Sequence, residues 1–252
     1  MILLVDAGNT RIKWAGLEGA VLQSGAAVLR RDGAEDVDSL ATLWAALPVP
    51  QRLLIASVAG PEFGARIGAW TKKFWGLAPE FVTAQAEAFG VTNAYTEPQR
   101  LGVDRWLALI AARRLAAGPV CVVDCGTALT VDVLAEDGAH LGGLIIPGLG
   151  LMRRALLEKT AGIEAAIGEL SREEVSLLAK DTRSGVMGGT LYATIAVIDR
   201  IVQDVTEAIG SELTCVLTGG DAEAVRPLLP AGFRHEPELV LKGLAIVAEA
   251  QS

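Results

Sequence analysis

Two short stretches of the chain combine a carboxylate, a glycine and a hydroxyl in the same order. "LLVDAGNTRIKWAGL" (3–17) and "VVDCGTALTVDVL" (122–134) each read as an apolar strand, Asp-x-Gly, a small polar residue and a second apolar stretch. Asp6 thus corresponds to Asp124, and Gly8 to Gly126. Such a turn offers N–H groups and hydroxyls to phosphoryl oxygens, and its carboxylate can hold a neutralising cation. The pair favours polyphosphate binding and phosphoryl transfer, which needs mainly positioning and charge stabilisation.

The alternative to a binding turn is an ordinary hairpin turn with no ligand, because Asp and Gly are common turn residues. One turn alone would indicate little, whereas the matched pair favours a binding role. Lys13, on the outgoing strand, would add a positive charge to the same edge. The dipeptide Gly-Lys of a Walker A loop is absent from the sequence, and no G-x-G-x-x-G leads from a strand into a helix. The glycine-rich "GGLIIPGLG" (142–150) fits either close packing or a site role.

The elements that must position these turns follow from periodicity and from Gly/Pro punctuation. In the first half we expect strands at 2–6, 10–16, 20–29 (interrupted at Gly25), 52–58 and 80–84, and helices at 36–47, 61–74 and from about Pro98 to Ala117. In the second half we expect strands at 119–124, 128–134, 140–146 and 213–219, a further short strand, and helices at 150–160, 171–180, 184–209, 221–229 and 239–250.

Three strands followed by alternating helices and strands therefore occur twice. An internal repeat of this kind predicts a duplicated α/β architecture. We place the division near Ala117–Pro119, with an N-terminal half at 1–117 and a C-terminal half at 118–252. A central cleft between the halves is the expected ligand site.

Composition excludes several classes of protein. With 51% hydrophobic residues the chain can bury a substantial core, and its net charge of −8 argues against a nucleic-acid surface. No apolar run reaches the roughly 18 residues of a membrane helix, and "MILLVD" lacks the basic lead-in of a signal peptide. We expect a cytoplasmic protein. Three cysteines in apolar strands and only two histidines predict buried, reduced thiols and no zinc site.

Six motifs carry a resemblance that covers nearly the whole chain: "DAGNTRIKW", "NAYTEPQRLGVDRW", "VVDCGTALTVDV", "GGLIIPG", "DTRSGVMGG" and "LTGGDA". In order and spacing the sequence resembles the type III pantothenate kinases. These belong to the acetate and sugar kinase, Hsc70 and actin superfamily, whose duplicated ribonuclease-H-like halves clamp ATP. The resemblance implies ATP-dependent phosphorylation of pantothenate, the first step of coenzyme A synthesis. Two alternatives remain open: another kinase or phosphohydrolase of the superfamily, or a regulatory protein like the related Bvg accessory factors.

The resemblance also implies an ATP site. The first turn would bind the phosphates through Asp6, Ala7, Gly8, Asn9, Thr10, Arg11, Ile12 and Lys13, with Asp6 next to Mg²⁺. In the second turn, Asp124 would hold a monovalent cation (K⁺ or NH₄⁺) and Thr127 would contact the phosphates. Gly219 and Gly220 would let the adenosine lie against backbone, although Gly-Gly is also an ordinary strand-to-helix turn.

For pantothenate, the resemblance implies contacts from Tyr95, Gly102, Val103, Asp104, Arg105 and Thr182. Several of them have a structural alternative. Tyr95 could be a half-buried aromatic, Arg105 a helix-surface salt bridge, and Thr182 the cap of a helix starting near Ser184. The family also forms dimers with this pocket near the interface. The mean hydropathy of +0.40 is apolar for a monomer of this size, which agrees with a homodimer using "GGLIIPGLGLM" and the 184–209 helix.

The catalytic base is expected to be Asp104. A primary alcohol is a poor nucleophile at neutral pH and benefits from a positioned base. Neither histidine lies in a motif, and Asp6 and Asp124 are assigned to cations. The alternative for Asp104 is a first-turn acid stabilised by the helix dipole.

Overall fold

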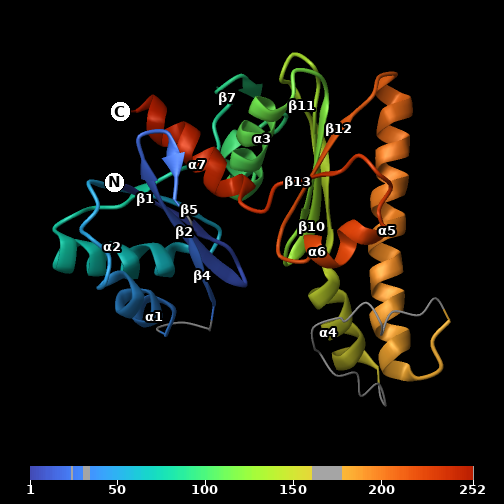
Figure 1. The fold of residues 1–252 in the computed structure, drawn as a ribbon, viewed down its shortest axis with the longest axis horizontal. Coiled ribbons are helices and arrows are strands. Elements are labelled where there is room, and N and C mark those ends of the chain that lie inside the picture. Colours follow the sequence, from blue (N-terminus) through green and yellow to red (C-terminus); the bar gives the residue numbers. More distant parts are fainter. Residues whose placement is uncertain (24, 31–34, 161–177, 252) are drawn as a thin grey trace. The chain divides into compact units, whose positions relative to one another are not determined.

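The computed structural model describes residues 1–23, 25–30, 35–160 and 178–251, and the chain divides into two compact units. The first unit contains Met1–Leu115 together with Glu238–Ser252, and the second contains Ala116–Pro237. Figure 1 shows both as mixed α/β units.

A mixed sheet forms the centre of the first unit. It consists of β1 (Ile2–Ala7), β2 (Arg11–Glu18), β3 (Val21–Leu22), β4 (Ala26–Leu29), β5 (Arg52–Ser57) and β6 (Glu80–Phe81). The strand order is β3-β2-β1-β5-β6, with β4 also paired to β2. Strand β1 runs antiparallel to β2 but parallel to β5. The run "ILLVDA" is apolar nearly throughout because a central strand of such a sheet is buried on both faces.

Helices cover both faces of this sheet. Leu3 and Val5 pack with α1 (Glu35–Trp44) and α2 (Pro61–Trp75), where Trp44 is fully buried. Side chains alternate between faces, so Leu4 points to the opposite side, which α3 (Val103–Leu115) and α7 (Leu239–Ala250) cover. A small hairpin of β7 (Glu87–Ala88) and β8 (Val91–Thr92) and a 3₁₀ turn, η1 (Pro98–Arg100), precede α3.

The second unit repeats the sheet. Its elements are β9 (Val120–Cys125), β10 (Ala128–Leu134), β11 (His140–Pro147), α4 (Leu149–Lys159), α5 (Thr182–Ile209), β12 (Thr214–Thr218), α6 (Ala222–Val225), η3 (Arg226–Leu228) and β13 (Arg234–His235). The order β11-β10-β9-β12-β13 matches the first sheet, with the first pairs antiparallel and the last two parallel. The repeated order confirms the predicted duplicated, ribonuclease-H-like α/β architecture.

Most predicted strands lie within one or two residues of the observed ones. The strand predicted at 80–84 covers only Glu80–Phe81, the helix predicted at 36–47 ends at Trp44, and three further elements differ. The long helix expected from Pro98 begins only at Val103, after a 3₁₀ turn and Gly102. The 20–29 strand is two short strands, β3 and β4. The 221–229 helix is a short α-helix followed by a 3₁₀ turn that contains Pro227, which cannot continue a helical hydrogen-bond ladder. The helix predicted at 171–180 lies largely outside the described residues.

The closing helix α7 groups with the first unit, whereas the sequence placed it in the half at 118–252. Its apolar residues pack on α3, where a side chain on Gly243 would overlap the backbone of Leu107. The missing side chain lets the two helices approach closely. A repeat in the sequence therefore need not mark the boundary between packed units.

Helix α5 is the one described helix that is long and apolar enough, by length and composition, to cross a membrane. Core helices of soluble proteins pass the same test. Leu191 and Ile198 lie in the hydrophobic core of the second unit, with Val123 and Val131 of its sheet. These contacts are those of a core helix.

All three cysteines are buried and free, as expected.

Candidate functional site

The first Asp-x-Gly turn lies at the end of β1. Asp6 and Lys13 are direct partners in the β1–β2 register, so both side chains lie on the same face of the sheet, and both are half-buried. Gly8 N donates to Arg11 O at 3.0 Å, which closes the turn. Asn9 at its tip is exposed. A carboxylate and an ammonium group therefore lie beside an open turn.

Arg30, which follows β4, supports this turn and was not found from the sequence. Its backbone N donates to Thr10 O at 2.8 Å, and its Nη1 donates to Gly8 O at 3.2 Å. Ala7 and Ile12 are fully buried, so these two predicted ATP-binding residues can offer only backbone to a ligand. Nothing in the sequence around Arg30 marks it, because the contact depends on the pairing of β4 with β2.

The second turn, at the end of β9, is enclosed by other backbone. Gly126 N donates to Ala128 O, and Gly148 N donates to Thr127 O, both at 3.2 Å. A Cβ on Gly148 would overlap the carbonyl oxygens of Gly126 and Thr127. Of the two interpretations of "GGLIIPGLG", close packing therefore applies at Gly148. This glycine packs against the turn that was predicted to bind phosphate.

Gly219, the residue that follows the neighbouring strand β12, lies against Asp124. It has φ +97, and a Cβ there would overlap Asp124 Oδ1 and the backbone of Cys125. Asp221 N donates to Cys125 O at 2.9 Å, which fixes the chain after the Gly-Gly pair. Gly219 is thus required for the backbone to pass over a carboxylate, while Gly220 is exposed.

Two carboxylates gather at the end of β9. Burial raises the pKa of the Cys125 thiol, and the nearby negative charges of Asp124 and Asp221 raise it further. Carboxylate and carbonyl oxygens are ligands that hard cations prefer, so this end fits a cation. Among the described residues, no group of three or more His, Cys, Asp and Glu side chains could hold a metal by itself. Mg²⁺ characteristically takes only one or two carboxylates, and substrate phosphates and water complete its shell.

The predicted pantothenate residues of the first unit form one group at the start of α3. Arg105 is 7% exposed, and its Nη1 donates to the Tyr95 hydroxyl at 3.0 Å. Asp104 Oδ1 accepts from Arg105 N at 2.8 Å. A side chain on Gly102 would clash with this carboxylate oxygen. Val103 is buried in the first turn of the helix. Since Arg105 is buried and bonded to Tyr95, the surface salt-bridge interpretation is excluded.

Asn93 holds the loop that carries Tyr95 and was also missed. Its Oδ1 accepts from Tyr95 N at 2.9 Å, while its Nδ2 donates to Gln85 O and Pro98 O. Asn in a Pro-flanked loop is a turn residue by type, which is the only signal the sequence offered.

Thr182 lies in the first turn of α5, in the second unit, and is exposed. The helix cap is Asp181, whose carboxylate accepts from Ser184 N at 2.9 Å and from Ser184 Oγ at 2.8 Å. These bonds lower the pKa of Asp181. The capping alternative for Thr182 is therefore wrong, and its hydroxyl is not needed for the cap.

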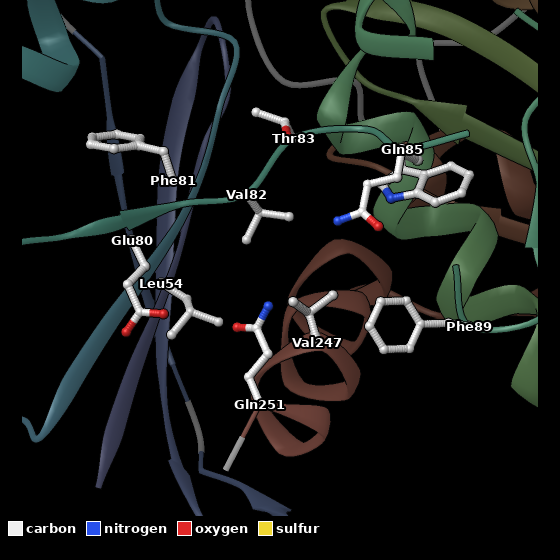
Figure 2. Close-up of a pocket in the computed structure, with 10 residues that line it drawn as sticks. Leu54, Glu80, Phe81, Val82, Thr83, Gln85, Phe89, Val247 and Gln251 are labelled. Atoms are coloured by element: carbon white, nitrogen blue, oxygen red, sulfur yellow. The ribbon is translucent and has the colours of Figure 1, made fainter. Parts of the chain in front are cut away.

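The first unit also contains a pocket of about 180 Å³ between the sheet edge and α7 residues such as Val247. Figure 2 shows Phe89 and Val247 pointing into it, with the amides of Gln85 and Gln251 at its sides. None of the predicted site residues lines it. The turns are assigned by their backbone and charge rather than by a cavity.

Comparison with known proteins decides the family. The family model of type III pantothenate kinases matches residues 2–204. This chain belongs to the type III pantothenate kinases. A type III pantothenate kinase of Nitrosococcus oceani is 45% identical, over 100% of this chain and 95% of that protein. One of Aromatoleum aromaticum is 40% identical, over 98% of each.

Solved structures agree at the level of the fold. A conserved Campylobacter jejuni protein assigned to the Baf family of transcriptional activators superposes with a TM-score of 0.60 at 17% identity, covering 99% of this chain and 98% of its own. A Sinorhizobium meliloti protein described as a 2-dehydro-3-deoxygalactonokinase gives 0.56 at 16% identity, covering 100% and 99%. The shared fold of a type III pantothenate kinase and a sugar kinase agrees with the two matching sheets described above.

Proposed function

We propose that this type III pantothenate kinase transfers the γ-phosphoryl group of ATP to the primary hydroxyl of pantothenate. The observation that carries the proposal is the pair of Asp-x-Gly turns at the ends of β1 and β9, which occupy the same position in two sheets of the same topology. Phosphoryl transfer depends chiefly on positioned amides, hydroxyls and charges, and these turns supply them.

The first turn is assigned to the ATP phosphates. Asn9 and Thr10 are exposed at its tip, and Lys13 adds a point charge beside Asp6. Asp6 would hold Mg²⁺ together with phosphate oxygens, and the ion would supply charge neutralisation there. Arg30 donates hydrogen bonds to the carbonyl oxygens of Gly8 and Thr10. The backbone N–H groups of the turn therefore keep their direction.

The second turn is assigned to a monovalent cation and to the phosphates. Asp124 would hold K⁺ or NH₄⁺, because its carboxylate and the carbonyl oxygen of Cys125 lie together against Gly219. Thr127 would contact the phosphates, and Gly219 with Gly220 would border the adenosine. A fixed set of oxygens suits a cation that is selected by size.

Asp104 is assigned as the general base. Its Oδ1 is held by Arg105 N, so the carboxylate has a fixed direction in which to accept the hydroxyl proton as the phosphorus–oxygen bond forms. Arg105 would bind the pantothenate carboxylate through paired N–H donors, with Tyr95 holding the guanidinium in place. Gly102 and Val103 shape this part of the site, and Thr182 would supply a hydroxyl from α5.

A homodimer is part of the proposal. Strand β11 is at the edge of its sheet and exposes Leu141, Leu144 and Ile145, the last at 65%. On α5, Tyr192 is also partly exposed. An apolar edge strand is a natural pairing surface. Light scattering at micromolar concentration should give twice the chain mass, and a mass near 26 kDa would contradict the dimer.

The test of the reaction combines product analysis with one variant. Wild-type protein with ATP, Mg²⁺ and K⁺ should release ADP only when pantothenate is present, and mass spectrometry should detect phosphopantothenate. Asp104→Asn should keep ATP binding but lower kcat about 10²–10⁴-fold, the usual contribution of a general base. A folded variant that turns over within about threefold of wild type would move the base elsewhere.

A further inference from the structure

Arg153 is a buried cation that the proposed reaction does not use. It lies on α4 and is 8% exposed. Burial lowers the pKa of its guanidinium, and the nearby carboxylate of Asp221 opposes that effect. A buried charge is costly unless other groups compensate it, so its surroundings should show what it is for.

On one side, Arg153 is tied to α5. Its Nε donates to the Thr190 hydroxyl at 3.1 Å. The same hydroxyl lies 2.9 Å from Val186 O, to which it can donate its own proton. A hydroxyl has one proton and two lone pairs, so Thr190 can accept from Arg153 while it donates to α5. The bond therefore links the two helices in a defined orientation.

On the other side, α4 begins directly on the second Asp-x-Gly turn. Its N-cap is Gly148, which donates to Thr127 O at 3.2 Å. Helical side chains tilt toward the N-terminus, so the Arg153 side chain leans back toward this first turn of α4. Asp221, whose charge acts on Arg153, in turn donates from its backbone N to Cys125 O.

We propose that Arg153 is a positioning residue that holds the second turn, because it fixes α4, which begins on that turn, to α5 through Thr190. The inference rests on the proposed function, because it assigns the cation and ATP phosphates to that turn. Arg153 keeps Thr127 and Asp124 in place for those ligands without touching them.

A purely stabilising role is a poor explanation of this arrangement. Replacing a buried ionic group by an apolar side chain of similar size is often neutral or stabilising. In the part of the chain that the structure describes, Arg153 Nη2 is buried and has no hydrogen-bond partner, and a buried unpaired donor costs stability. Its hydrogen bond to Thr190 leads to α5 instead, and the helix that carries it begins on the second turn.

The test compares Arg153→Met with Arg154→Met, its exposed neighbour on the same helix. Two quantities are measured: the Kd of ATP with Mg²⁺ and K⁺ by calorimetry without pantothenate, and the K⁺ concentration for half-maximal activity. Arg153→Met should raise both about 10- to 100-fold, the usual loss when a group that orients a ligand residue is removed. The KM for pantothenate and both Arg154→Met values should stay within about twofold of wild type, as for an exposed side chain away from the site.

Arg153→Lys keeps a charge and should recover part of the loss. If Arg153→Met lowers the melting temperature but leaves Kd and the K⁺ requirement within twofold of wild type, Arg153 is only structural and the proposal fails. If Arg153→Met does not fold, Thr190→Val decides: a rise in both constants supports the proposal, and unchanged constants overturn it. A wild-type protein that binds ATP but does not phosphorylate pantothenate would refute the proposed function alone, since the calorimetry needs no pantothenate.

Discussion

The two Asp-x-Gly turns have nearly the same sequence and the same place in their sheets, yet their surroundings differ. The first leaves Asn9 and Thr10 exposed and is held by the side chain and backbone of Arg30. The second is half-buried and pressed between the glycines at 148 and 219. An open turn with a lysine beside it leaves room for a polyphosphate, whereas an enclosed turn with two nearby carboxylates presents its oxygens to a bound cation. In the proposed assignment, the packing around the turns, rather than their sequence motif, divides their roles.

The largest expected effect is a loss of stability when a glycine in or beside each turn is replaced by alanine, because the space around the two glycines differs. Gly219→Ala should destabilise the protein by about 3 kcal/mol, since it combines a positive φ with overlap on Asp124 and Cys125. In Gly8→Ala the new methyl group would lie 3.2 Å from Arg11 O in an exposed turn, and the loss should be about 1 kcal/mol. Urea unfolding of both variants measures the difference. Equal losses would show that the second turn is no more enclosed than the first.

A middle-sized effect is expected at Arg30. Arg30→Met removes the bond to Gly8 O and should raise the KM for ATP about fivefold, equal to roughly 1 kcal/mol for one hydrogen bond. The half-activating K⁺ concentration should not change, because the second turn is untouched. Steady-state kinetics against Arg200→Met, an exposed arginine on α5, is the matched comparison. A change in K⁺ requirement with constant KM for ATP would reverse the assignment of the two turns.

The smallest change in kinetic constants is expected at the middle residue of the Asp-x-Gly turn. Ala7 and Cys125 occupy the same position, and both are buried. Cys125→Ala gives the second turn the same middle residue as the first. The variant should lose about 1 kcal/mol of unfolding free energy through lost packing, and its kinetic constants should stay within about twofold of wild type. Thermal unfolding and a K⁺ titration measure this. A large change in the K⁺ requirement would give the thiol a role that packing does not.

Local pattern predicted the strands and turns well, because β1, β2, β9 and β10 are short apolar runs bounded by Asp-Gly turns. It could not predict the support for those turns. Arg30, Gly148 and Arg153 contact residues that strand pairing and helix packing bring near them from other parts of the sequence. The apolar α7 was predicted as a helix. An apolar pattern predicts that a helix is buried but does not show which surface it packs against, and in the structure α7 packs on α3. The family resemblance supplied the roles that spacing alone left open.

The most direct test of the division between the turns is the cation requirement of pantothenate-dependent ADP release. Wild-type protein should be active in K⁺ or NH₄⁺ and close to background in a bulky organic cation, with Mg²⁺ constant throughout. Asp124→Asn should need a much higher K⁺ concentration while its Mg²⁺ requirement stays the same, and Asp6→Asn should show the reverse. Equal wild-type rates in K⁺, Na⁺ and the organic cation would contradict the account.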